Sequence, residues 1–80
     1  MCRSIHTLYN IDPPVTEAEV HEAALQFVRK ISGYHKPSKA NEDAFIRAID
    51  EIEVASSRLL SSLRTEAPLR TRNSLIMRRD

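Results

Sequence analysis

Cys2 is the side chain in this sequence best suited to nucleophilic chemistry. A small second residue permits removal of Met1, which would expose an N-terminal aminothiol with His6 or the freed amine as its base. The ordinary alternative is a small apolar residue near the end of a chain. Cys2 and His6 are therefore the candidate catalytic residues of a thiol-dependent enzyme or redox sensor.

A zinc site is a second chemistry to consider. Cys2 and His6 are two potential ligands, and His21 and His35 could complete a set of one thiolate and three imidazoles. His21 lies near the start of a predicted helix and His35 beyond its end. The helical rise separates them by about 20 Å, so they cannot bind one ion within a protomer. A zinc site shared across a dimer, with two ligands from each protomer, remains an alternative. We predict no metal and no other cofactor for the single chain.

A basic segment between two predicted helices has the composition of a phosphate-binding site. It combines four fixed positive charges with an aromatic ring able to stack on a base, next to a helix N-terminus whose free N–H groups attract anions. The candidate binding residues are Arg29, Lys30, Tyr34, His35, Lys36 and Lys39.

Two observations oppose that interpretation. Basic residues at the end of a helix interact favourably with the helix dipole, so they need no ligand to explain them. Glu42 and Asp43 repel anions from the start of the next helix. The C-terminal segment adds a second basic element in its favour, with the four arginines Arg70, Arg72, Arg78 and Arg79.

Length and charge limit the classes of function. Eighty residues exclude multidomain enzymes and repeat arrays, and a single Gly disfavours a phosphate-cradling loop. Twelve bases against eleven acids leave a net charge of +1, so the chain is not globally basic. No apolar run is long enough to span a bilayer, and the first residues lack the apolar segment of a secretory signal. We therefore expect a cytoplasmic protein with no membrane contact.

The first helix is predicted over residues 16–32. Thr16 and Glu19 make a capping box behind Pro13 and Pro14, and Gly33 is the expected left-handed residue after the end. Its apolar stripe is Val20, Ala23, Ala24, Phe27, Val28 and Ile31.

The second helix is predicted to begin at Asn41, with Ser38 as a competing start about one turn earlier, and to continue to about residue 64. Its apolar face is formed by Phe45, Ala48, Ile49, Ile52, Ala55, Leu59, Leu60 and Leu63. The expected fold is all-α, an antiparallel two-helix hairpin over residues 16–64.

The second helix is the longer one, so three leucines project beyond the first: Leu59, Leu60 and Leu63. An N-terminal arm, residues 1–15, is expected to fold over them with Ile5, Leu8, Tyr9 and Ile11. Residues 65–80 are expected to form a flexible basic tail. Leu25, Ile46 and Val54 lie off the main stripes, which is consistent with a homodimer contact and equally with isolated apolar residues on the surface.

Four blocks of the sequence are distinctive: Met1 to Arg3, Pro13-Pro14, Ala24 to Gly33, and Lys36 to Asn41. In these blocks the chain resembles a family of small bacterial proteins, domain of unknown function 2277, over roughly residues 1–68. The resemblance implies a bacterial cytosolic setting and carries over no catalytic residue. The segment from Leu69 onward departs from the family pattern.

The function expected from these features is non-catalytic. We expect a binding or interaction module that meets nucleic acid, another polyanion or a larger protein complex through its basic loop. The alternative is the thiol-dependent enzyme or redox sensor that uses Cys2.

Overall fold

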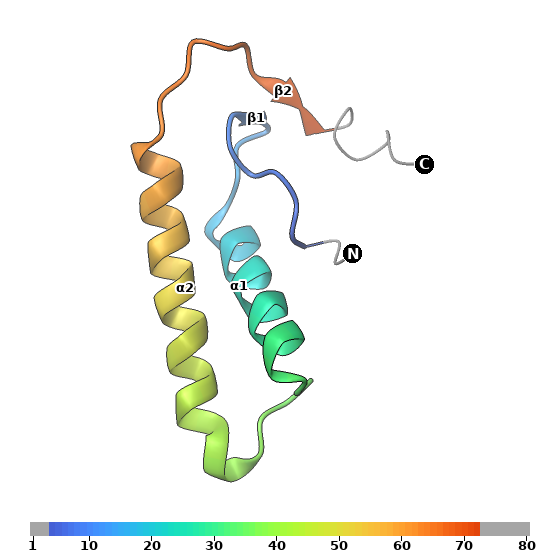
Figure 1. Ribbon diagram of the computed structural model, residues 1–80. Coiled ribbons are helices and arrows are strands. Elements are labelled where there is room, and N and C mark those ends of the chain that lie inside the picture. The colour runs from blue at the N-terminus through green and yellow to red at the C-terminus, as the bar shows by residue number, and fades with distance from the viewer. Residues whose placement is uncertain (1–3, 73–80) are drawn as a thin grey trace.

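The computed structural model describes residues 4–72, and two packed helices make up most of it. Helix α1 spans Glu17–Ser32 and helix α2 spans Glu42–Ser62, with the 3-10 turn η1, Lys39–Asn41, between them. The chain runs along α1, turns, and returns along α2 (Figure 1). A helical hairpin was predicted, and both helices lie within two residues of their predicted bounds.

The ends of α1 follow the predicted local chemistry. Thr16 Oγ1 accepts a hydrogen bond from the Glu19 N–H at 3.2 Å, and the Thr16 N–H donates to Glu19 Oε1 at 2.8 Å. This capping box satisfies backbone N–H groups at the helix start. At the other end, Gly33 has φ 82° and its N–H donates to the Arg29 carbonyl at 2.9 Å. Both predicted boundaries of α1 are confirmed.

The start of α2 differs in detail from the prediction. Asn41 holds the N-cap position, but its side chain makes no cap hydrogen bond. Its Nδ2 instead donates to Ser38 Oγ at 2.9 Å and to the Tyr34 hydroxyl at 3.4 Å. Ser38 is the N-cap of η1, so the two competing starts mark the two ends of one 3-10 turn.

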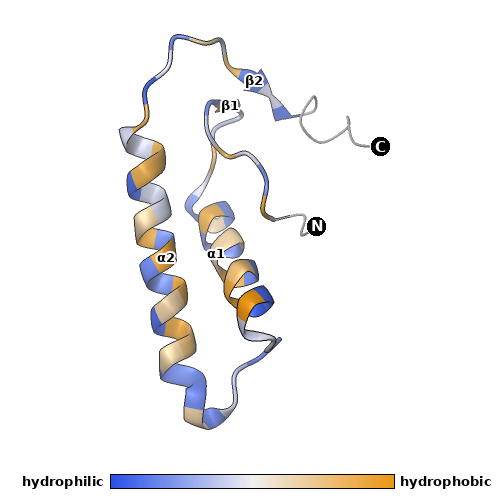
Figure 2. Ribbon diagram, viewed as in Figure 1, coloured by the Kyte–Doolittle hydropathy of each residue, from blue (hydrophilic) through white to orange (hydrophobic). Residues whose placement is uncertain are grey.

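The hydrophobic core lies between the two helices and is small. Ala24, Val28, Phe45 and Ile49 form its buried cluster. Leu25, Ala48 and Ile52 pack against that cluster while partly exposed. Hydrophobic segments recur along both helices in Figure 2, whereas the loop that joins them is hydrophilic.

A two-stranded parallel sheet corrects the all-α prediction. Strand β1, Ile11–Asp12, pairs with strand β2, Arg70–Thr71. Asn10 directs this pairing, because its carbonyl accepts from the Arg70 N–H at 3.0 Å and its Nδ2 donates to the Pro68 carbonyl at 3.0 Å. The segment expected to be a flexible tail therefore contacts the arm over its described part, and residues 73–80 lie outside the described residues.

Two of the three projecting leucines are not buried as expected, and the third, Leu60, is half-buried. Leu59 and Leu63 remain 56% and 44% exposed, whereas Ile11 of β1 is only 4% exposed. The backbone hydrogen bonds of the arm join it to residues 70–71, and the Asn10 side chain donates to the carbonyls of Ala67 and Pro68. Pairing with β2 therefore determines where the arm lies.

Candidate functional site

The predicted basic loop is held in place by three hydrogen bonds. Arg29 Nε donates to the His35 carbonyl at 3.0 Å, which ties the last turn of α1 to the loop. The Tyr34 N–H donates to Ser32 Oγ at 3.1 Å, and the Tyr34 hydroxyl accepts from Asn41. These contacts give a defined conformation to a loop that contains no regular structure before η1.

The basic loop is taken as residues 29–39, which includes the last turn of α1, and its lysine side chains face solvent. Lys30, Lys36 and Lys39 are exposed, and none of them forms an ion pair within residues 4–72. Tyr34 is 43% exposed, so part of its ring is open to a stacking partner. The six predicted binding residues thus share one end of the hairpin, although the Arg29 guanidinium is partly occupied by the loop backbone.

Acidic residues limit where an anion can bind at this end. Glu42 and Asp43 are exposed in the first turn of α2. They oppose anion binding at the α2 N-terminus while leaving the lysines of the loop accessible. From position 29 to position 43, four fixed positive charges stand against these two negative charges.

An open apolar groove runs beside the loop, between the end of α1 and the first half of α2. Its volume is about 280 Å³. It is lined by Val28, Ile31, Ser32, Tyr34, Asn41, Ala44, Phe45, Ala48 and Ile52. Sequence reasoning assigned most of these apolar residues to the core and did not foresee a groove.

His6 and His21, which were considered for thiol chemistry and for zinc, make separate contacts in the described structure. Cys2 lies outside the described residues. His6 Nδ1 lies 3.1 Å from the Thr7 carbonyl, and His21 Nδ1 lies 2.8 Å from Glu53 Oε1, which links α1 to α2. Between positions 4 and 72, no three His, Cys, Asp or Glu side chains are placed to hold a metal ion.

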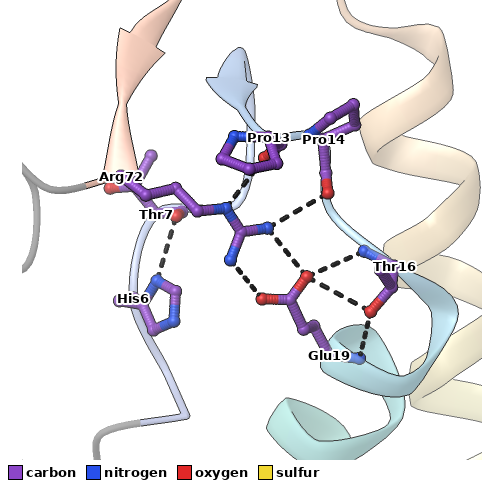
Figure 3. A network of polar contacts seen from close by, with 7 residues as sticks. All are labelled: His6, Thr7, Pro13, Pro14, Thr16, Glu19 and Arg72. Atoms are coloured by element: carbon purple, nitrogen blue, oxygen red, sulfur yellow. Dashed lines mark hydrogen bonds and ion pairs between the residues drawn. The ribbon is translucent and has the colours of Figure 1, made fainter.

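A polar network at the start of α1 was not predicted (Figure 3). Arg72 donates to both carboxylate oxygens of Glu19, at 2.5 Å from Nη1 and 2.8 Å from Nη2. Its Nε donates to the Pro13 carbonyl at 2.8 Å and its Nη2 to the Pro14 carbonyl at 3.1 Å. The hydrogen bonds from Arg72, and then from the Thr16 N–H, lower the pKa of Glu19 to about 2. The only sequence signal was the capping box that contains Glu19.

Comparison with known proteins now identifies the family. The model of the family described as "Uncharacterized conserved protein (DUF2277)" matches residues 1–78. The chain belongs to the DUF2277 family. The resemblance drawn from the sequence blocks is thereby confirmed, and the match also includes the segment from Leu69 onward that was expected to depart from the pattern. No curated protein and no solved structure matches the chain.

The family description of DUF2277 states no activity, so the function of this member is inferred from its geometry. Over residues 4–72 this DUF2277 chain has no helix long and apolar enough to cross a membrane. Its chemically distinctive surfaces are the basic loop and the adjoining groove. The first offers cations and an aromatic ring, and the second offers apolar contact area.

Proposed function

We propose that this protein is a non-catalytic binding module whose basic loop contacts a polyanion. The observation that supports the proposal is the exposure of three lysines, Lys30, Lys36 and Lys39, at the same end of the hairpin as the exposed ring of Tyr34. None of these lysines forms an ion pair within residues 4–72. Lysines neutralise phosphates, and an aromatic ring stacks on unpaired bases. Single-stranded nucleic acid is therefore the polyanion that fits this loop best.

The hydrogen bonds of the loop support the same proposal energetically. Binding costs less conformational entropy when the contacting groups are already held in position. Arg29 and Asn41 hold the two sides of the loop through His35 and Tyr34. The lysine side chains are exposed and form no ion pair within residues 4–72, so the site suits phosphate contacts more than the reading of a base sequence.

A salt titration tests this function. Binding of a fluorescent single-stranded RNA is measured by anisotropy while the salt concentration is raised. Three lysine–phosphate contacts predict a slope of about −2 in a plot of log affinity against log salt concentration. An affinity that does not fall with added salt would contradict the proposal.

Charge reversal locates the contact. The double variant Lys36→Glu and Lys39→Glu should lower the affinity by about tenfold or more. The matched control is Arg58→Glu with Arg64→Glu, which changes the net charge equally with two exposed bases at the other end of the hairpin. Equal losses in both double variants would mean that only net charge matters.

The proposal also includes the setting and the assembly state. We place the protein in the bacterial cytoplasm, as the sequence resemblance implied. We further propose a homodimer, because a core of this size supplies little stability and small domains often gain the rest from a partner subunit. A larger protein complex is the alternative partner for the same surfaces.

A further inference from the structure

The hairpin is a single layer of helices. The molecule measures 16 Å across its thinnest direction, and one helix with its side chains is already about 10–12 Å wide. Stable domains usually pack two layers around a shared core. The face of the hairpin that carries the apolar groove therefore has no second layer in the single chain, and Ile31 on that face is 68% exposed.

The side of the groove formed by α2 is lined by a row of three residues. Its members are spaced by four residues and lie along one side of the helix: Ala44, Ala48 and Ile52. The residues one position later turn toward α1, since Phe45 and Ile49 are buried in the core and Glu53 bonds His21. The residues one position before each member of the row therefore lie on the side of α2 that faces away from α1.

The outer rim of the groove consists of Asp43, Arg47 and Glu51, one position before each member of the row. All three are exposed. Their charges alternate along the helix as negative, positive and negative. Part of this rim complements itself when a second helix runs in the opposite direction and is offset so that Arg47 lies level with Glu51.

We infer that the groove face binds a second copy of the chain, with the two α2 helices antiparallel across a two-fold axis level with Ile49. In this register the apolar rows of both copies alternate along the seam at intervals of about 3 Å. Arg47 of each copy lies level with Glu51 of the other, so two reciprocal ion pairs flank the seam. The result is a four-helix bundle in which the helices of the second copy cover Ile31.

Small residues in the row permit this approach. Ala44 and Ala48 let two helix axes come within about 8 Å, the short end of the usual range. The groove gives each copy a concave surface, and the alternating rows supply side chains to fill it. Unlike charges in the rim select the antiparallel direction, because a parallel second copy would place like charges beside each other.

The inference deepens the homodimer part of the proposed function and does not require polyanion binding. If both hold, the antiparallel arrangement places the two Lys39 residues about 30 Å apart along the bundle, at opposite ends. One polyanion long enough to span them would then contact the exposed lysines of both loops, which raises avidity. Tyr34 also lines the groove, so this shared contact is assigned to the lysines alone.

Sedimentation velocity over a concentration series tests the inference. The wild-type chain should approach twice its mass of 9.1 kDa. Arg47→Glu and Glu51→Arg should each raise the dimer dissociation constant about tenfold or more, because each puts like charges level with one another in both pairs. An equimolar mixture of the two variants should restore a dimer, since their rims are complementary. Both positions are exposed, and circular dichroism verifies that each variant is folded.

A control variant separates the possible failures. Ile46→Glu changes an exposed apolar residue on the side of α2 opposite the row, and we expect it to leave the dimer intact. Loss of the dimer in this control, with Arg47→Glu still dimeric, would overturn the assigned face and keep the homodimer. A wild-type monomer at every concentration would overturn both, whereas the salt titration with RNA judges the polyanion contact independently.

Discussion

Arg72 and Glu19 form an ion pair through two hydrogen bonds although 53 positions separate them in the sequence. Arg72 also bonds the carbonyls of Pro13 and Pro14, so one guanidinium joins the end of β2, the arm and the first turn of α1. Glu19 serves the capping box at the same time. The pair therefore couples the start of α1 to both segments that flank the hairpin.

Replacement of Arg72 should destabilise the fold. Arg72→Lys keeps the positive charge but loses the planar fork that bonds two carboxylate oxygens and two carbonyls together. We expect a lower melting temperature by circular dichroism. The matched control, Arg58→Lys, alters an exposed arginine that has no ion pair within residues 4–72 and should melt like the wild type. Equal melting temperatures for both variants would show that the network adds no stability.

The stability contributed by Glu19 should depend on pH in the acid range. Its pKa is about 2 in the folded chain against an ordinary value of 4.5, so the folded state favours the ionised carboxylate. The contribution is present above pH 4.5 and is lost as the pH falls toward 2. The measurement is the difference in melting temperature between the wild type and Glu19→Gln across this range. A difference that stays constant with pH would contradict the ion pair as its cause.

Gly33→Ala should cost about 1–2 kcal/mol in the free energy of unfolding. The reason is backbone strain alone, since Gly33 has φ 82° and an added Cβ would meet no atom within 4 Å. Gly33→Asn is the control and should cost less, because Asn tolerates the left-handed conformation better than Ala. Urea denaturation measures both. An alanine variant as stable as the wild type would mean that the turn after α1 adopts another conformation.

Cys2→Ser separates the binding module from the thiol-dependent alternative. We expect this variant to bind single-stranded RNA with unchanged affinity, because the proposed contact uses only the loop. Lys36→Glu with Lys39→Glu should weaken binding in the same assay. A loss of binding in Cys2→Ser alone would favour the thiol hypothesis over the polyanion proposal.

The local signals in the sequence were sufficient to predict α1. A capping box and a glycine with positive φ act through neighbours a few residues away, so Thr16, Glu19 and Gly33 could be interpreted without knowledge of the fold. The pairing of β1 with β2 depends on contacts across almost the whole chain. Two-residue strands have no periodicity, and nothing near Asn10 in the sequence indicates that it bonds Pro68.

The same contrast applies to the candidate site. The basic loop is a local cluster in the sequence, and the structure places its predicted residues at one end of the hairpin. The groove and the Arg72 network are products of packing. Any of twelve bases could have paired with Glu19, and the choice follows from β2 bringing Arg72 to the start of α1.

Nitrogen-15 correlation spectra, recorded while single-stranded RNA is added, test the proposed loop contact most directly. We expect the largest chemical-shift changes at the amides of Lys30, Tyr34, Lys36 and Lys39. The amides at the start of α1, at the other end of the hairpin, should change much less. These changes should shrink when salt is added. Changes confined to the arm and β2, or none at saturating RNA, would contradict the assignment of the loop as the polyanion-binding surface.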